Sequence, residues 1–155
     1  MRLGADAYDW TQIPRSYNAR GRLVLGYDEW PAEAWEAFPL ATKVRIATSA
    51  EQNGLQYCVL DVERYDATVA QAPGWLERQH AIGALWPTFY VEESGLASLR
   101  GQLARWVPGL AYSVWVAWWD HPVRVPGCVG QQMGPVSGAE SWDLSFFWDA
   151  TWQDR

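Results

Sequence analysis

Basic residues are scarce in this chain, which contains a single lysine, Lys43, and no run of lysines and arginines. Its 155 residues carry 12 basic and 18 acidic side chains, so the formal net charge is −6. Binding to a phosphate backbone is driven by clustered lysines and arginines. The charge balance therefore argues against a nucleic-acid partner.

Long apolar runs are absent as well. No segment has the length of about 20 apolar residues that a transmembrane helix needs, so we expect no membrane insertion. The N-terminus, MRLGADAYDW, meets acidic and polar residues at once and lacks the apolar region of a secretory signal. We therefore expect synthesis in the cytoplasm with no signal peptide.

Cysteine and histidine occur only twice each. Cys58 lies in an apolar segment, where a free cysteine is usually a small buried residue, and the sequence leaves a disulfide with Cys128 open. Neither belongs to a Cys-x-x-Cys pair, and His80 and His121 lie too far apart to form a ligand pattern. The sequence predicts no metal site and no cofactor.

Tryptophan is abundant by contrast, with 12 residues. Trp75 and Trp115 are expected in the core, but residues 118–120 (WWD) and 141–143 (SWD) lie near predicted loops. Flat aromatic faces at a surface stack on sugar rings or anchor interfaces. In an acidic chain, a saccharide or a protein is a better-matched partner than a nucleic-acid base.

Predicted strands and helices alternate over the first two-thirds of the chain, and after residue 109 only strands follow. This order implies a parallel sheet with helices outside it. We expect strands at residues 3–7, 22–27, 43–47, 57–63, 87–91, 112–117, 127–132 and 142–147, and helices at 31–38, 73–85 and 94–106.

About eight strands predict an α/β fold, a compact, irregular (β/α) barrel whose last strands lack helices, with residues 1–155 forming one domain. A full barrel usually has about 250 residues, so an open α/β sheet is the alternative. Within the last helix, we expect Ser94 to be the N-cap and Trp106 to lie on the apolar face.

Residues 56–63 (QYCVLDVE) predict an apolar strand that ends in two carboxylates, Asp61 and Glu63. Residues two apart on a strand project to the same face, so Val59, Asp61 and Glu63 share one side. Two nearby carboxylates in different environments can hold different pKa values, as an acid/base site needs. The alternative is that both acids are simply solvated where the strand enters a loop.

Acids recur where the other predicted strands end. In a barrel and in an open sheet alike, ligands bind at the carboxyl ends of parallel strands, so we expect a carboxylate-lined cleft. Asp28 and Glu29 could instead mark the start of a helix. The acids near predicted strand ends are Asp6, Asp9, Asp28, Glu29, Asp61, Glu63, Glu92, Glu93, Asp120 and Asp143.

These segments occur in an order similar to that of the family 25 glycoside hydrolases. The matching segments are VLDVE, PTFYV, VWVAWWD and a late GQQ…WDLS, over roughly residues 3–149. The likeness is stronger to a lysozyme-like group common in actinobacteria and their phages, through residues 66–68 (DAT) and 72–75 (APGW). The resemblance implies a muramidase with a compact barrel whose final strands lack helices.

The resemblance also implies roles for single residues in cleaving the glycan of peptidoglycan. Glu63 matches the general acid, and Asp61 matches the carboxylate that orients the substrate's own N-acetyl group as the nucleophile. Asp6 and Asp143 match aspartates that line the cleft. The residues expected to contact the saccharide are Tyr27, Tyr90, Trp118, Trp119, Asp120 and Gln132.

Some features depart from the family. The chain is shorter than a typical member, we expect no attached wall-binding module, and Met133 follows Gln132 where tyrosine is more usual. The alternative function is therefore a lysozyme-like domain without catalysis, a saccharide-binding or structural part of a phage particle. The expected partners are peptidoglycan or a related saccharide and a larger virion or lytic assembly. Release would occur by a holin-type route, in a phage particle, or by non-standard secretion.

Overall fold

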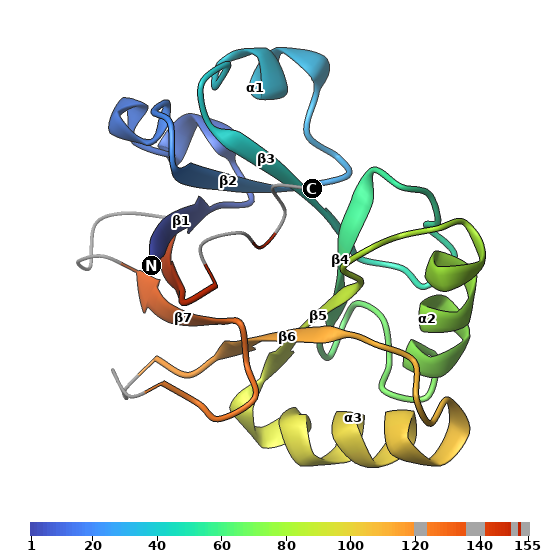
Figure 1. The fold of residues 1–155 in the computed structure, drawn as a ribbon. Helices are drawn as coiled ribbons and strands as arrows, with labels where there is room; N and C mark the ends of the chain where they lie inside the picture. The colour runs from blue at the N-terminus through green and yellow to red at the C-terminus, as the bar shows by residue number, and fades with distance from the viewer. Residues whose placement is uncertain (120–123, 136–141, 150–151, 153–155) are drawn as a thin grey trace.

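The computed structural model describes residues 1–119, 124–135, 142–149 and 152. Its strands follow one another in chain order around a closed barrel (Figure 1). The eight strands are β1 (Arg2–Asp6), β2 (Arg22–Tyr27), β3 (Thr42–Ala47), β4 (Tyr57–Val62), β5 (Thr88–Glu92), β6 (Ser113–Ala117), β7 (Gly130–Pro135) and β8 (Asp143–Phe147).

The barrel is parallel except where it closes. Strands β1 to β7 run parallel to one another, whereas β8 lies antiparallel between β7 and β1. Because β8 runs in reverse, its first residue, Asp143, lies opposite Asp6 at the carboxyl end of β1. The predicted compact α/β barrel is confirmed, and the open sheet is excluded because β8 joins both of its edges.

Three α-helices cover part of the outside of the barrel (Figure 1): α1 (Ala32–Glu36), α2 (Ala72–Ala81) and α3 (Glu93–Trp106). They follow β2, β4 and β5, and two short 3₁₀ helices, η1 (Trp10–Gln12) and η2 (Arg15–Tyr17), follow β1. In the described part of the chain, no helix follows β3, β6 or β7, which is how so short a chain closes a barrel. The helices seen in those residues are all too short or too polar to cross a membrane.

Strand β5 passes into α3 without a loop, because Glu92 ends the strand and the helix begins at the next residue. The prediction that Ser94 is the N-cap is therefore wrong. Its hydroxyl lies within the first turn and donates to the Glu92 carboxylate at 3.3 Å. Trp106 is 60% exposed and not packed, because Leu103 and Val107 take the buried positions at this end of the helix.

Side chains alternate along each strand between the barrel interior and the outer face, as the period of two requires. On β4, Val59 packs inside with Leu25 and Ile46, whereas Leu60 and Val62 pack outward in the cluster that includes α2 and α3. This arrangement agrees with the two faces predicted for β4. Burying apolar side chains on both sides of the sheet stabilises the barrel.

Both cysteines are free thiols, so the disulfide that the sequence left open does not form. Cys128 is buried, as small apolar residues are, but Cys58 is only half-buried. Cys58 borders a cavity of about 220 Å³ at the amino ends of β4 and β5, and no acid is among the residues that line it. Burial raises the pKa of the Cys58 thiol to about 11, so this thiol is a poor nucleophile at neutral pH.

Trp152 closes the amino end of the barrel and is 1% exposed. Its ring stacks on Phe147, with centroids 4.3 Å apart and planes 10° apart. Its indole Nε1 donates to Thr88 Oγ1 at 3.0 Å, and its carbonyl accepts from the Arg2 guanidinium at 3.1 Å. Because Thr88 and Arg2 begin β5 and β1, Trp152 connects the starts of these two strands with Phe147 at the end of β8.

We predict that Trp152→Ala lowers the free energy of unfolding by about 3–5 kcal/mol, the usual cost of removing a fully buried large aromatic side chain. Urea denaturation followed by circular dichroism measures this change. The matched control is Trp106→Ala, which removes an exposed tryptophan and should change stability by less than about 1 kcal/mol. Equal denaturation midpoints for the two variants would contradict the role of Trp152.

Candidate active site

The carboxyl ends of the parallel strands surround a cleft of about 450 Å³. It lies at the opposite end of the barrel from Trp152, which is the end where (β/α) barrels bind their ligands. The cleft is lined by Tyr27, Glu63, Tyr90, Glu92, Glu93, Ser94, Ala117, Trp118, Trp119, Gln132 and Asp143.

Asp61 and Glu63 reach the cleft end of the barrel from β4. Asp61 pairs in register with Tyr90 of β5 and is 2% exposed. Glu63 lies one residue beyond the strand, is half-buried and lines the cleft. One strand therefore delivers two carboxyl groups to two environments, the first buried and the second open to a ligand.

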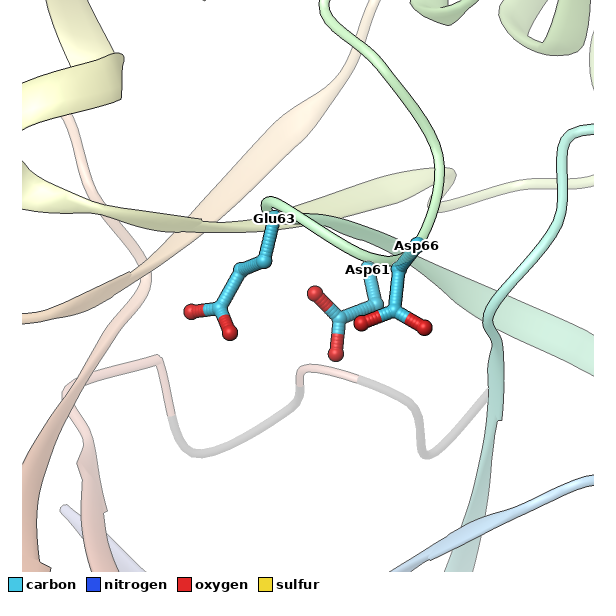
Figure 2. A group of neighbouring side chains, drawn as sticks. All are labelled: Asp61, Glu63 and Asp66. Atoms are coloured by element: carbon cyan, nitrogen blue, oxygen red, sulfur yellow. The ribbon is translucent and has the colours of Figure 1, made fainter.

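A turn after β4 brings a third acid, Asp66, to this pair. The backbone N–H of Asp66 donates to the Glu63 carbonyl, and that of Ala67 donates to the Asp61 carbonyl, both at 3.2 Å. As a result, one carboxylate oxygen from each of the three acids lies within 4.8 Å of the other two (Figure 2). Asp66 was not predicted as a site residue, because its position depends on these two backbone hydrogen bonds.

Gln132 of β7 connects the opposite wall of the cleft to the acids. Its Oε1 accepts from the Tyr90 hydroxyl at 2.7 Å and from Trp119 Nε1 at 3.0 Å. Its Nε2 donates to Asp6 Oδ2 at 2.9 Å and to Asp143 Oδ2 at 3.4 Å. One amide thus fixes two aromatic side chains and two carboxyl groups.

The buried acids hold their protons more strongly than free carboxyl groups do. Burial raises the pKa of Asp61 to about 9, and the charges of Glu63 and Asp66 add to the effect. Burial also raises the pKa of Asp6 well above its usual value; Asp143 adds to this, and the hydrogen bond from Gln132 opposes it. Burial therefore favours the protonated form of Asp61 unless a positive charge lies close to it.

The acids that line the cleft are shifted in the same direction. Burial and the charge of Glu92 raise the pKa of Glu63, while a hydrogen bond from Tyr90 acts against them. Burial raises the pKa of Asp143 as well. A raised pKa is what a carboxyl group needs in order to deliver a proton near neutral pH.

No basic side chain among the described residues lies within 4.0 Å of these acids. The ion pair found among those residues joins Arg45 to Asp28 at 3.8 Å, on the outer face of the barrel. Arg64 follows Glu63 in the sequence, but its guanidinium carbon lies over the Tyr65 ring, 5.2 Å from the centroid. The negative charge of the cleft is therefore not balanced by described arginine or lysine side chains.

The structure gathers most of the residues predicted for the site. Asp6 is buried next to the cleft, and Asp143 lines it from the first position of β8. Asp120 was predicted to contact the saccharide, but it lies outside the described residues, as does His121. The predicted residues that line the cleft are Tyr27, Glu63, Tyr90, Trp118, Trp119, Gln132 and Asp143.

Two acids expected near the strand ends have other partners. Asp28 accepts hydrogen bonds from the Tyr57 hydroxyl and, at 3.0 Å, from the Gln52 side chain, so it braces the outer face of the barrel. Asp9 is the N-cap of η1 and accepts from the Thr11 backbone at 2.9 Å. Neither joins the cleft, because a strand that ends in a loop can direct an acid outward as easily as inward.

Over its described residues, the structure therefore has the closed barrel whose last strands lack helices, and the acid-lined cleft at its carboxyl end, that the sequence predicts. The crystal structure of the bacterial lysozyme from Streptomyces coelicolor has a similar fold, with a TM-score of 0.56, 15% sequence identity, and coverage of 94% of this chain and 91% of that chain. No protein-family model matches the chain, and no curated protein matches it in sequence. The resemblance to family 25 lysozymes is therefore confirmed in the fold.

We predict that Gln132→Leu lowers the free energy of unfolding by about 1–3 kcal/mol, because it removes the hydrogen bond to the buried Asp6 carboxyl and one that the Tyr90 hydroxyl makes. Urea denaturation measures the change. The control is Met133→Leu, a volume-conserving change at the half-buried neighbour, which should cost less than about 1.5 kcal/mol. A Gln132→Leu protein as stable as the wild type would contradict the bridging role of this amide.

Proposed function

We propose that this protein is a lysozyme-type glycoside hydrolase that cleaves the glycan of peptidoglycan. The observation that carries the proposal is the position of Asp61 and Glu63, with one acid buried and the other in the cleft, at the carboxyl end of a lysozyme-like barrel. Tyr27, Trp118 and Trp119 in the cleft walls offer faces on which sugar rings can stack.

Glu63 is the proposed general acid. It lines the cleft, its pKa is raised mainly by burial, and it can deliver its proton to the glycosidic oxygen as the bond to the leaving sugar breaks. After the leaving sugar departs, the Glu63 carboxylate can take a proton from the water that completes hydrolysis. The same residue thus serves as acid in the first step and as base in the second.

The spacing of the two acids favours retention of configuration. Inverting glycosidases hold their carboxyl groups about 6.5–9.5 Å apart to leave room for a water molecule. Here one oxygen of Asp61 lies within 4.8 Å of one oxygen of Glu63, which favours the shorter separation of about 5–5.5 Å found in retaining enzymes. A double displacement, in which a nucleophile first replaces the leaving sugar, fits the spacing better.

Asp61 is poorly placed to be that nucleophile, because it is 2% exposed. The N-acetyl group of the substrate is the proposed alternative: its carbonyl oxygen attacks the anomeric carbon, and a cyclic oxazolinium ion forms as the glycosidic bond breaks. Asp61 orients the acetamido group during this step. Water then opens the ring and restores the original configuration.

If the domain were non-catalytic, we would expect a side chain to block the cleft or a basic group to neutralise Glu63. Trp142 is buried instead against Tyr17, with ring centroids 5.4 Å apart, and does not line the cleft. Arg64 lies over Tyr65, and among the described residues Glu63 has no ion pair. These contacts favour hydrolysis over a purely structural role.

Delivery to the cell wall would come from a larger virion or lytic assembly. The chain has a formal net charge of −6, which gives no general attraction to an anionic wall.

We predict that Glu63→Gln lowers the rate of glycan cleavage by at least about 10²-fold while the fold is retained, because the amide cannot deliver the proton. Release of new reducing ends from purified peptidoglycan measures the rate. The control is Glu77→Gln on the exposed side of α2, which removes the same charge far from the cleft and should cleave at the wild-type rate. Wild-type cleavage by Glu63→Gln would remove Glu63 from the mechanism, and no cleavage by the folded wild type would favour the binding module.

We also predict that the first-formed product keeps the β configuration of the cleaved bond. The close spacing of Asp61 and Glu63 favours a double displacement over direct attack by water on the opposite face of the sugar. Proton NMR of a chitooligosaccharide digest, recorded before the anomers equilibrate, distinguishes the two outcomes. An α product appearing first would show inversion and rule out the acetamido mechanism.

A further inference from the structure

Asp61, Glu63 and Asp66, which we call the acid cluster, contain one more carboxyl group than the proposed hydrolysis uses. Asp66 has no part in either chemical step. Yet the turn after β4 holds it so that one of its oxygens lies within 4.8 Å of one oxygen on each of the other two acids. Figure 2 shows the three carboxyl groups turned toward the same space. Like charges this close favour the binding of a positive ion between them.

An oxygen without a partner points to the same place. Asp61 is buried, and its Oδ1 has no hydrogen-bond donor. In Figure 2 its carboxyl group lies between those of Glu63 and Asp66, so the side chain that carries this oxygen points into the cluster. A buried polar atom that lacks a protein partner usually contacts a water molecule or an ion. Among the described residues, no basic side chain supplies that contact.

The chemistry of the cluster selects the type of ion. All of its donors are carboxylate oxygens, with no histidine or cysteine among them, and such donors suit hard cations better than zinc or copper. Bonds from Ca²⁺ to oxygen are about 2.3–2.6 Å long, against about 2.0–2.1 Å for Mg²⁺. Three oxygens that lie within 4.8 Å of one another therefore need to approach each other less to bind Ca²⁺ than to bind Mg²⁺.

We propose that Ca²⁺ binds between Asp61, Glu63 and Asp66 and that it inhibits the enzyme. A cation on Asp61 and Glu63 occupies the oxygens that would orient the acetamido group and protonate the glycosidic oxygen. Binding of the ion stands on the geometry alone, whereas inhibition rests on the proposed hydrolase function. Asp66 is then the residue that adds control by calcium to an acid pair that cleaves glycan.

Isothermal titration of the metal-free protein with CaCl₂ tests binding directly. We expect one Ca²⁺ per chain with a dissociation constant below about 1 mM, in the range of sites with few charged ligands. Asp66→Asn and Asp61→Asn should each weaken binding at least about 10-fold, since each removes a charged ligand. Glu77→Gln on α2 is the matched control and should bind as the wild type does. Circular dichroism of each variant confirms that it is folded.

A parallel arm measures release of reducing ends from peptidoglycan over the same calcium range. We expect the wild type and Glu77→Gln to lose activity with a midpoint equal to the dissociation constant. No binding to the wild type at about 10 mM CaCl₂, or unchanged binding by Asp66→Asn, would overturn the calcium site. Binding without loss of activity would overturn the inhibition. A wild type that binds calcium but never cleaves glycan would support the ion site and overturn the hydrolase function instead.

Discussion

Closure of the barrel by β8 is the constraint on which the rest of the structure depends. This strand is the only one in the described barrel that runs antiparallel, and it joins β7 to β1. At its first residue it places Asp143 opposite Asp6 in the cleft, and at its last it places Phe147 beneath Trp152. Between them, Ser145 accepts a hydrogen bond at 3.1 Å from the buried Trp115 indole. One short strand thus completes the sheet, the core and the acid-lined rim.

Among the residues that the structure describes, the acids of the cleft lack the basic side chains that usually accompany buried acids. Asp6 and Asp61 are buried with one oxygen each lacking a hydrogen-bond partner, and burial raises the pKa of both. Because their folded-state pKa values lie above those of the unfolded chain, these acids lower the stability of the folded protein progressively as pH rises from the unfolded pKa of about 4 to the raised folded pKa. Buried acids with raised pKa values are typical of functional sites, where they contact a substrate or a bound cation.

Most of the fold could be predicted from the sequence, because the apolar runs and the proline-led helices mark nearly every element. The acid pair could also be predicted, since the period of two fixes the side to which Asp61 and Glu63 point. Asp66 could not, because its position depends on two backbone hydrogen bonds in a turn. Asp28 was expected near the cleft but braces the outer face, since its partners Tyr57 and Gln52 come from another part of the chain. Contacts between distant residues leave no periodic signal.

The two ends of the barrel divide stability from function. At the amino end, Trp152 has its indole nitrogen and its carbonyl satisfied, and its ring is stacked on Phe147. At the carboxyl end, polar atoms are left without partners and acids face one another across the cleft. The stabilising contacts at the amino end offset the destabilising groups at the carboxyl end. The side-chain amide of Gln132 donates to both Asp6 and Asp143. It therefore limits how far these two carboxyl groups can move apart, and it holds them where they can contact a substrate or an ion.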